Sequence, residues 1–209
     1  MKHFFTFLLT LSLTLTLNAE EKATKKVYIS SGVLSVDVIH DGKPVSIMRN
    51  QDKKNFISKR YSTTGNGKIQ PMHPFAPHAV ETIGELEMID YVKQKSAGDD
   101  SLLIVDTRTP NWVGISGGIP TAINIPYTKL KNKDSALEIM EDQLGVQIDD
   151  AFNFSYAKTL VMYCNGNWCG QTPTAIKALL GFGYPAAKIK YYRGGMQSWK
   201  SLGLTTVSL

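Results

Sequence analysis

Residues 159–180 read TLVMYCNGNWCGQTPTAIKALL, and this stretch decides the fold. Its first five residues form a short apolar run rich in β-forming side chains, which predicts a buried strand. The next eight residues include two glycines and two asparagines, a composition typical of a tight loop. The pattern then becomes helical, with Thr172 as N-cap and Pro173 as the first helical residue. Cys164 is therefore expected at the carboxyl end of a strand, facing a loop that leads into a helix N-terminus.

This position favours a reactive thiol at Cys164. Loop N–H groups and the first turn of a helix carry partial positive charge, which stabilises a thiolate over a thiol. A free thiol has a pKa of about 8.5, and such surroundings lower it to roughly 3.5–7.5. Because only the thiolate is a good nucleophile, Cys164 is a candidate catalytic nucleophile. The alternative is a buried cysteine with a structural role only.

Composition limits the range of functions. The chain has 209 residues, of which 43% are apolar, enough for one ordinary domain and an extension. The formal net charge is +5, but the Lys and Arg residues are scattered and not interleaved with aromatic residues. We therefore expect no nucleic-acid partner, and the modest basicity favours a small anionic substrate.

The N-terminus has the features of a signal peptide at residues 1–19. Lys2 supplies the positive start, an apolar stretch occupies residues 4–17, and Ala19 ends a suitable cleavage site. This stretch is shorter than the roughly 20 residues needed to span a bilayer. The mature protein is expected to be periplasmic or secreted, with no membrane attachment after cleavage.

Two cysteines in an exported protein would ordinarily predict a disulfide. Cys164 and Cys169 lie only five positions apart, so a bridge between them closes a short loop and adds little stability. We expect such a bridge to matter for chemistry instead. A redox partner protein would then be needed to return the loop to its thiol form.

Residues 20–80 are predicted to form an N-terminal extension that contains a β-hairpin. Residues 33–39 alternate between apolar and polar side chains, residues 40–43 (HDGK) are a turn signal, and residues 45–48 return as the second strand. The next segment is polar and irregular, then rich in proline and histidine. We place a domain boundary near residue 80.

Strands and helices are predicted to alternate over residues 81–209. Thr82 and Glu85 fit a capping box at the start of a helix. Residues 114–120 are glycine-rich and expected to be flexible. The other predicted strands are 102–105, 122–125 and 189–192, and the other predicted helices are 135–144 and 196–202. This alternation predicts an α/β fold with an open parallel sheet flanked by helices, whose ligands bind beyond the carboxyl ends of the strands. The residues that come after strands there are Asp106, Arg108, Cys164 and Arg193.

Four segments together resemble a rhodanese domain. In chain order they are LLIVDTRTPNW, GGIPTAINIPYTKL, LVMYCNGNWCG and YYRGGMQSW, and the resemblance covers roughly residues 80–207. It implies a rhodanese-like open parallel sheet and a sulfurtransferase in which Cys164 takes a sulfane sulfur as a persulfide and passes it to a thiol or cyanide acceptor. We expect no cofactor and no metal. Asp106 and Arg108 match the family's Asp-x-Arg pair, with an architectural role near the site. The residues implied to bind the persulfide and the anionic donor are Asn165, Gly166, Asn167, Trp168, Cys169 and Gly170.

The chain departs from the family pattern at two places. Gly118 stands where rhodaneses usually have a histidine, and the loop lacks the Arg, Lys, Ser or Thr that many members carry. Two other functions therefore stay open: a thiol–disulfide oxidoreductase in which Cys169 resolves a bond on Cys164, and a non-catalytic binding module. A cysteine phosphatase is disfavoured because position 170 is glycine rather than the arginine that would clamp an oxyanion. The spacing of His73 and His78 matches no zinc site.

Overall fold

The computed structural model describes residues 25–209, so the predicted signal peptide at residues 1–19 lies outside the described residues. Its centre is a five-stranded parallel sheet in the order β3-β9-β8-β4-β5. The prediction of an open parallel α/β sheet is confirmed. The middle strand is β8, so Cys164 comes directly after the strand at the centre of the sheet. The strands of this sheet are β3 (Glu81–Ile83), β4 (Leu102–Asp106), β5 (Ile123–Asn124), β8 (Thr159–Tyr163) and β9 (Ile189–Tyr192).

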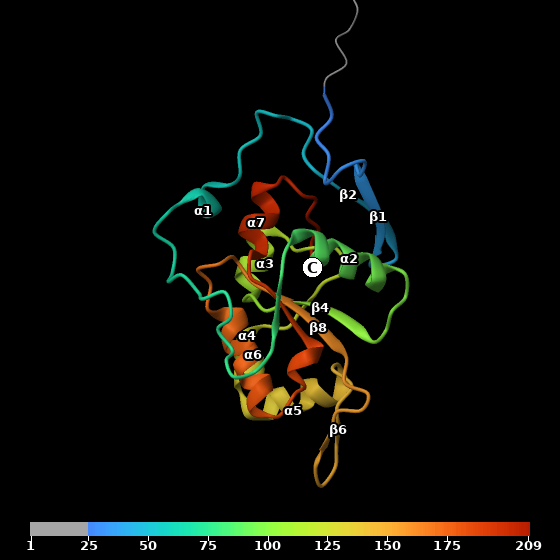
Figure 1. Cartoon of the computed structure of the whole chain (residues 1–209), viewed down its shortest axis with the longest axis vertical. Helices are drawn as coiled ribbons and strands as arrows, with labels where there is room; N and C mark the ends of the chain where they lie inside the picture. Colours follow the sequence, from blue (N-terminus) through green and yellow to red (C-terminus); the bar gives the residue numbers. More distant parts are fainter. Residues whose placement is uncertain (1–24) are drawn as a thin grey trace, which may run out of the picture.

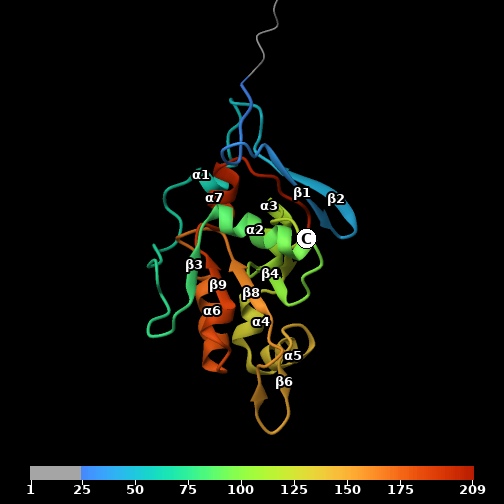
Figure 2. The same ribbon diagram turned by 45° about the vertical axis from the view of Figure 1, so that its right-hand side comes forward.

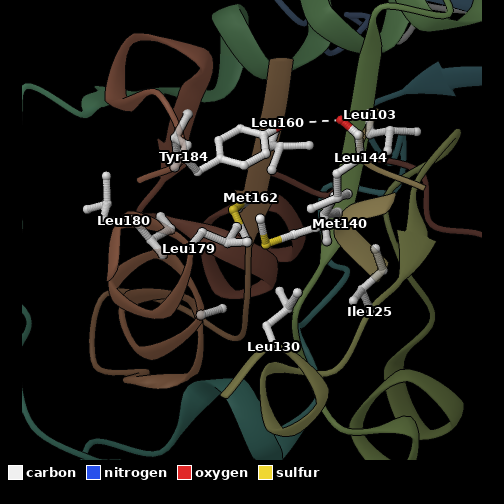
Figure 3. Close-up of a cluster of buried hydrophobic side chains, with 14 of the residues drawn as sticks. Leu103, Ile125, Leu130, Met140, Leu144, Leu160, Met162, Leu179, Leu180 and Tyr184 are labelled. Atoms are coloured by element: carbon white, nitrogen blue, oxygen red, sulfur yellow. Dashed lines mark hydrogen bonds between the residues drawn. The ribbon is translucent and has the colours of Figure 1, made fainter. Parts of the chain in front are cut away.

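Helices flank this sheet and enclose two hydrophobic clusters (Figure 1). One cluster, shown in Figure 3, joins the sheet to α4 (Tyr127–Lys131), α5 (Lys133–Asp142) and α6 (Gln171–Gly181). The other joins it to α2 (Glu85–Ser96), α3 (Pro110–Ser116) and α7 (Gly195–Ser201). A short 3₁₀ helix, Ala186–Lys188, precedes β9. Both faces of β8 are therefore buried, as its continuous apolar sequence requires.

The predicted hairpin is present in the extension as β1 (Ser35–His40) and β2 (Lys43–Met48). Its two-residue turn, Asp41 and Gly42, has positive φ at both positions, which is the geometry that matches the twist of a hairpin. The hairpin packs beside α2 (Figure 2). A second hairpin, β6 (Gln147–Ile148) with β7 (Phe152–Asn153), was not predicted because each strand has only two residues.

The extension is joined to the C-terminal end of the chain. After β2, the Asn50 N–H donates to the Gly203 carbonyl at 2.7 Å, and the Thr205 N–H donates to the Met48 carbonyl at 3.1 Å. Gly118 exchanges two backbone hydrogen bonds with Val207, at 2.7 and 3.0 Å. The C-terminal segment thus fills the space over Gly118, where a Cβ atom would lie 2.4 Å from the Leu209 side chain.

Three predicted boundaries are corrected. The helix after the cysteine loop begins at Gln171, so Thr172 is its second residue rather than its cap. Thr82 belongs to β3, and the Gly84 N–H at the start of α2 donates instead to the Glu87 carboxylate at 3.0 Å. Residues 114–116, the first part of the glycine-rich stretch predicted to be flexible, belong to α3, which starts at Pro110 in the manner typical of proline. No helix within residues 25–209 is long and apolar enough to cross a membrane.

Candidate active site

The two cysteines lie together beyond the carboxyl end of β8. Both are free thiols and both are almost completely buried, with exposed fractions of 2% for Cys164 and 4% for Cys169. The loop folds back on itself because the Cys169 N–H donates to the Gly166 carbonyl at 2.9 Å. The Cys164 thiol then points at Cys169, donating to its carbonyl oxygen at 3.5 Å. The loop therefore presents a pair of adjacent thiols.

The two thiols differ in acidity. Burial raises the pKa of Cys164 well above its ordinary value, and the hydrogen bond that its thiol shares with Cys169 raises it further. The interaction between the two side chains lowers the pKa of Cys169 to about 7, assisted by the N–H groups of Asn165 and Gln171. The predicted lowering of the Cys164 pKa is therefore wrong for the resting protein. The N–H groups of Asn165 and Gln171 act on Cys169, which is the more acidic thiol of the pair.

Asn165 and Gly166 are the buried residues of the loop between the cysteines. The Asn165 amide nitrogen lies 4.0 Å from the Cys169 sulfur. A Cβ atom on Gly166 would lie 2.9 Å from the Gln197 amide oxygen, so a larger residue there would displace the Gln197 side chain. These two residues hold the bend that brings the sulfurs together.

Asn167, Trp168 and Gly170 form the outer part of the loop. The Asn167 side chain is exposed, and its carbonyl accepts from the Gln70 N–H at 2.8 Å. The Trp168 indole N–H donates to the Gln197 amide oxygen at 2.8 Å. Gly170 is exposed and caps α6. The outer loop is thus anchored on one side by the extension and on the other by α7.

Asp106 and Arg108 form a completely buried ion pair. The Arg108 Nε donates to both Asp106 carboxylate oxygens, at 2.9 and 3.1 Å. Burial alone would lower the pKa of Arg108, but its hydrogen bonds to Asp106 raise it overall. Its guanidinium also donates to Ser116 and to the Gly117 carbonyl, both at 2.6 Å, which ties the end of β4 to the end of α3. These contacts are those of an architectural pair.

Tyr61 is a site residue that sequence reasoning missed. It lies in the extension, in the short helix α1 (Lys59–Ser62), and its side chain is only 1% exposed. Its hydroxyl donates to Asn165 Oδ1 at 3.0 Å and accepts from Arg108 at 3.3 Å. The surrounding sequence is polar and irregular, so no local pattern marks this tyrosine as buried.

The Arg193 side chain binds the N-terminal extension at Gln70. Its guanidinium donates twice to the Gln70 carbonyl, at 2.7 and 3.1 Å. The N–H group of the same Gln70 donates to the Asn167 carbonyl in the loop. Arg193 therefore anchors the segment that covers the cysteine loop.

An aromatic cluster borders the loop on its outer side. The Trp112 ring lies 6.1 Å from Tyr61 and 6.3 Å from Trp168, measured between ring centroids. The Arg60 guanidinium carbon lies 4.8 Å from the Trp112 centroid, so the extension brings a cation to this cluster. A cavity of about 530 Å³ lies beside it, lined by residues of the extension, the loop and α7, among them Tyr61, Asn66, Trp168 and Gln197.

Within residues 25–209, no group of three or more His, Cys, Asp or Glu residues is arranged to hold a metal.

The chain is similar to several solved structures at low sequence identity. The single-domain sulfurtransferase RDL2 of Saccharomyces cerevisiae is 22% identical, with 62% of this chain and 95% of that chain covered and a TM-score of 0.44. A protein of unknown function from Rhodopseudomonas palustris, described as a possible tyrosine phosphatase, is 20% identical, with 62% and 86% covered and a TM-score of 0.44. A thiosulfate sulfurtransferase from Pseudomonas aeruginosa is 18% identical, with 61% and 20% covered and a TM-score of 0.38. No curated protein sequence matches the chain.

The family model for the rhodanese-like domain matches residues 88–202. These residues include the strand and loop of Cys164, the Asp106–Arg108 pair and α7. The resemblance read from the sequence is thereby confirmed. Because the match covers more than half of the 209 residues, the chain belongs to the rhodanese-like domain family.

Proposed function

We propose that the protein is a sulfurtransferase that carries a sulfane sulfur as a persulfide on Cys164. One observation carries the proposal: Cys164 leaves the central strand with its thiol against Cys169, the more acidic thiol of a buried pair. The donor is a small sulfur anion such as thiosulfate, and the acceptor is a thiol or cyanide. Cys164 is the sulfur carrier, and the loop from Asn165 to Gly170 surrounds the sulfur that it holds.

The pair of thiols supplies the base that the reaction needs. In the resting protein the Cys164 thiol donates to the Cys169 carbonyl oxygen at 3.5 Å, and Cys169 is the more acidic thiol of the pair. As Cys164 attacks the sulfane sulfur of the donor, its proton passes to Cys169. With thiosulfate, the new S–S bond forms on Cys164, the S–S bond of thiosulfate breaks, and sulfite leaves with the bonding electron pair. A thiolate acceptor then attacks the outer sulfur and releases the Cys164 thiolate, which regains its proton from Cys169.

Thiol–disulfide exchange is a second candidate function, favoured by the closeness of the two free thiols. The Cys169 thiolate would attack the inner sulfur of the Cys164 persulfide, forming the Cys164–Cys169 disulfide and releasing hydrosulfide. A dithiol reductant, here a redox partner protein, would restore the thiols.

We place either reaction in the periplasm or outside the cell, with no nucleic-acid partner and no membrane attachment after signal cleavage.

The first test is persulfide formation on Cys164. The reduced protein is incubated with thiosulfate, and the peptide that contains Cys164 is analysed by mass spectrometry. We expect this peptide to gain the mass of one sulfur atom, and Cys164→Ser to lose the gain while keeping its melting temperature. A full gain in Cys164→Ser would overturn the proposal.

Cys169→Ser separates the two candidate functions. Under sulfur transfer, this variant should still form the persulfide on Cys164, at a lower rate because the base is missing. Under thiol–disulfide exchange, the unchanged protein should release hydrosulfide when no external thiol is added, and Cys169→Ser should release none. Under sulfur transfer, neither protein should release hydrosulfide in that condition. A non-catalytic binding module would form no persulfide in any of these proteins.

A further inference from the structure

We propose that Tyr61 is a positioning residue of this site, whose hydroxyl fixes the Asn165 amide with its N–H₂ end toward the Cys169 sulfur. The proposal rests on the proposed function, in which the two thiols carry the chemistry. It assigns to the N-terminal extension a part in the chemistry of a distant loop, since Tyr61 and Asn165 are 104 positions apart.

The hydrogen bonds around Tyr61 favour one direction for its hydroxyl proton. Arg108 can only donate, and it donates to Tyr61 at 3.3 Å and to Ser116 at 2.6 Å. The Ser116 hydroxyl donates its own proton to the Trp112 carbonyl at 2.8 Å. Two oxygen atoms lie 3.0 Å from the Tyr61 hydroxyl oxygen, Ser116 Oγ and Asn165 Oδ1. Ser116 Oγ already accepts the shorter bond from Arg108, so we assign the Tyr61 proton to Asn165 Oδ1. Burial raises the pKa of Tyr61, so the hydroxyl keeps this proton.

This direction decides which end of the Asn165 amide faces the sulfur. An amide has an acceptor oxygen and a donor nitrogen at nearly equivalent positions, so its neighbours must select the orientation. With Oδ1 held by Tyr61, Nδ2 is turned toward Cys169, 4.0 Å from its sulfur. A donor there favours the thiolate, whereas the flipped amide would place an oxygen against it. Tyr61 acts on the sulfur through Asn165 and does not contact it.

Other charged and titratable groups lie near the two cysteines and near Tyr61, but they do not account for the acidity of Cys169. Tyr191, in β9, faces both sulfurs, and burial raises its pKa so that it stays neutral while the thiols titrate. Arg193 lies beyond Tyr191 and is bound to Gln70. On the Tyr61 side, Asp106 and Arg108 neutralise each other, and Lys200 of α7 lies near Arg108.

The test is the pH dependence of alkylation at Cys169, measured with iodoacetamide on the full chain and assigned by peptide mass spectrometry. In Tyr61→Phe the pH midpoint of Cys169 alkylation should rise by roughly half a pH unit to one pH unit. The variant loses the hydrogen bond that holds the Asn165 amide with its N–H₂ group toward the Cys169 sulfur. Tyr184→Phe is the matched control. It also removes a buried tyrosine hydroxyl, which donates to the Lys158 carbonyl at 2.6 Å, but it lies in the cluster on the opposite face of the sheet. Its midpoint should stay unchanged.

A double-mutant cycle shows whether Tyr61 acts through the amide. Asn165→Ala should raise the midpoint as Tyr61→Phe does, and adding Tyr61→Phe to it should raise the midpoint no further. An unchanged midpoint in Tyr61→Phe, or additive rises in the double variant, would overturn the proposal. Because alkylation is measured without a sulfur donor, this result is independent of persulfide formation on Cys164. The two proposals can therefore fail separately.

Discussion

At the scale of single residues, the site depends on how one proton is shared between two sulfurs. Cys164 is the more deeply buried thiol, and it donates its proton toward Cys169. A buried thiolate is stable only when donors surround it, and the side chain of Cys164 and the N–H groups of Asn165 and Gln171 act on Cys169. The proposed carrier of the sulfur, Cys164, is thus the less acidic thiol of the pair.

Cys164→Ala should raise the pKa of Cys169 from its value of about 7, because it removes the hydrogen bond that contributes most to lowering that pKa. The alkylation of Cys169 would then begin at higher pH. Cys164→Ser is the control, since its hydroxyl can still donate and should move the midpoint less. An unchanged midpoint in Cys164→Ala would mean that the loop N–H groups alone set the acidity of Cys169.

At the scale of elements, the site is held by the ends of strands and by the loops and helices that succeed them. The Asp106–Arg108 pair ties β4 to the end of α3, where Ser116 and Gly117 accept two hydrogen bonds from Arg108. Both members of the pair are fully buried. A buried pair adds little net stability when intact but is costly to break, because one charge then stays buried without a partner.

Asp106→Asn should therefore lower the free energy of unfolding by about 3–5 kcal/mol, the cost typical of removing one partner from a buried ion pair. The measurement is urea denaturation monitored by circular dichroism. Asp90→Asn is the matched control: Asp90 pairs with Lys93 at 3.5 Å on the exposed face of α2, where ion pairs contribute little. If Asp106→Asn kept its stability but lost sulfur transfer, the pair would have a role in the chemistry instead.

Much of this arrangement could be predicted from sequence, since buried parallel strands read as short apolar runs. The predicted strand at residues 189–192 matches β9 at both ends, and β4 extends one residue beyond its prediction, to Asp106. The contact between Tyr61 and Asn165 could not be predicted, because it joins two segments with no periodic pattern to relate them. The acidity of Cys169 depends on that same folded geometry, so the sequence alone pointed to Cys164 instead.

At the scale of the whole molecule, the extension covers the cysteine loop rather than standing apart from the domain. Gly67 lies against Trp168 with φ at +49°, and Gln70 bonds to both Asn167 and Arg193. The C-terminal segment holds the other end of the extension through Met48 and Asn50. The extension and the domain thus pack together over the outer part of the cysteine loop.

Gly67→Ala should separate the extension from the loop. A Cβ atom at this position would lie 2.4 Å from the Trp168 carbonyl oxygen, and the positive φ is unfavourable for any other residue. We expect a loss of about 1–3 kcal/mol in stability, typical of local backbone strain, and faster alkylation of Cys169. The rate is measured well above the pKa of the thiolate, so that a change in acidity cannot imitate a change in access. Gly65→Ala is the matched control, because its Cβ would meet open space two residues away. If Gly67→Ala reacted no faster than Gly65→Ala while losing stability, the extension would support the fold without limiting access to the sulfurs.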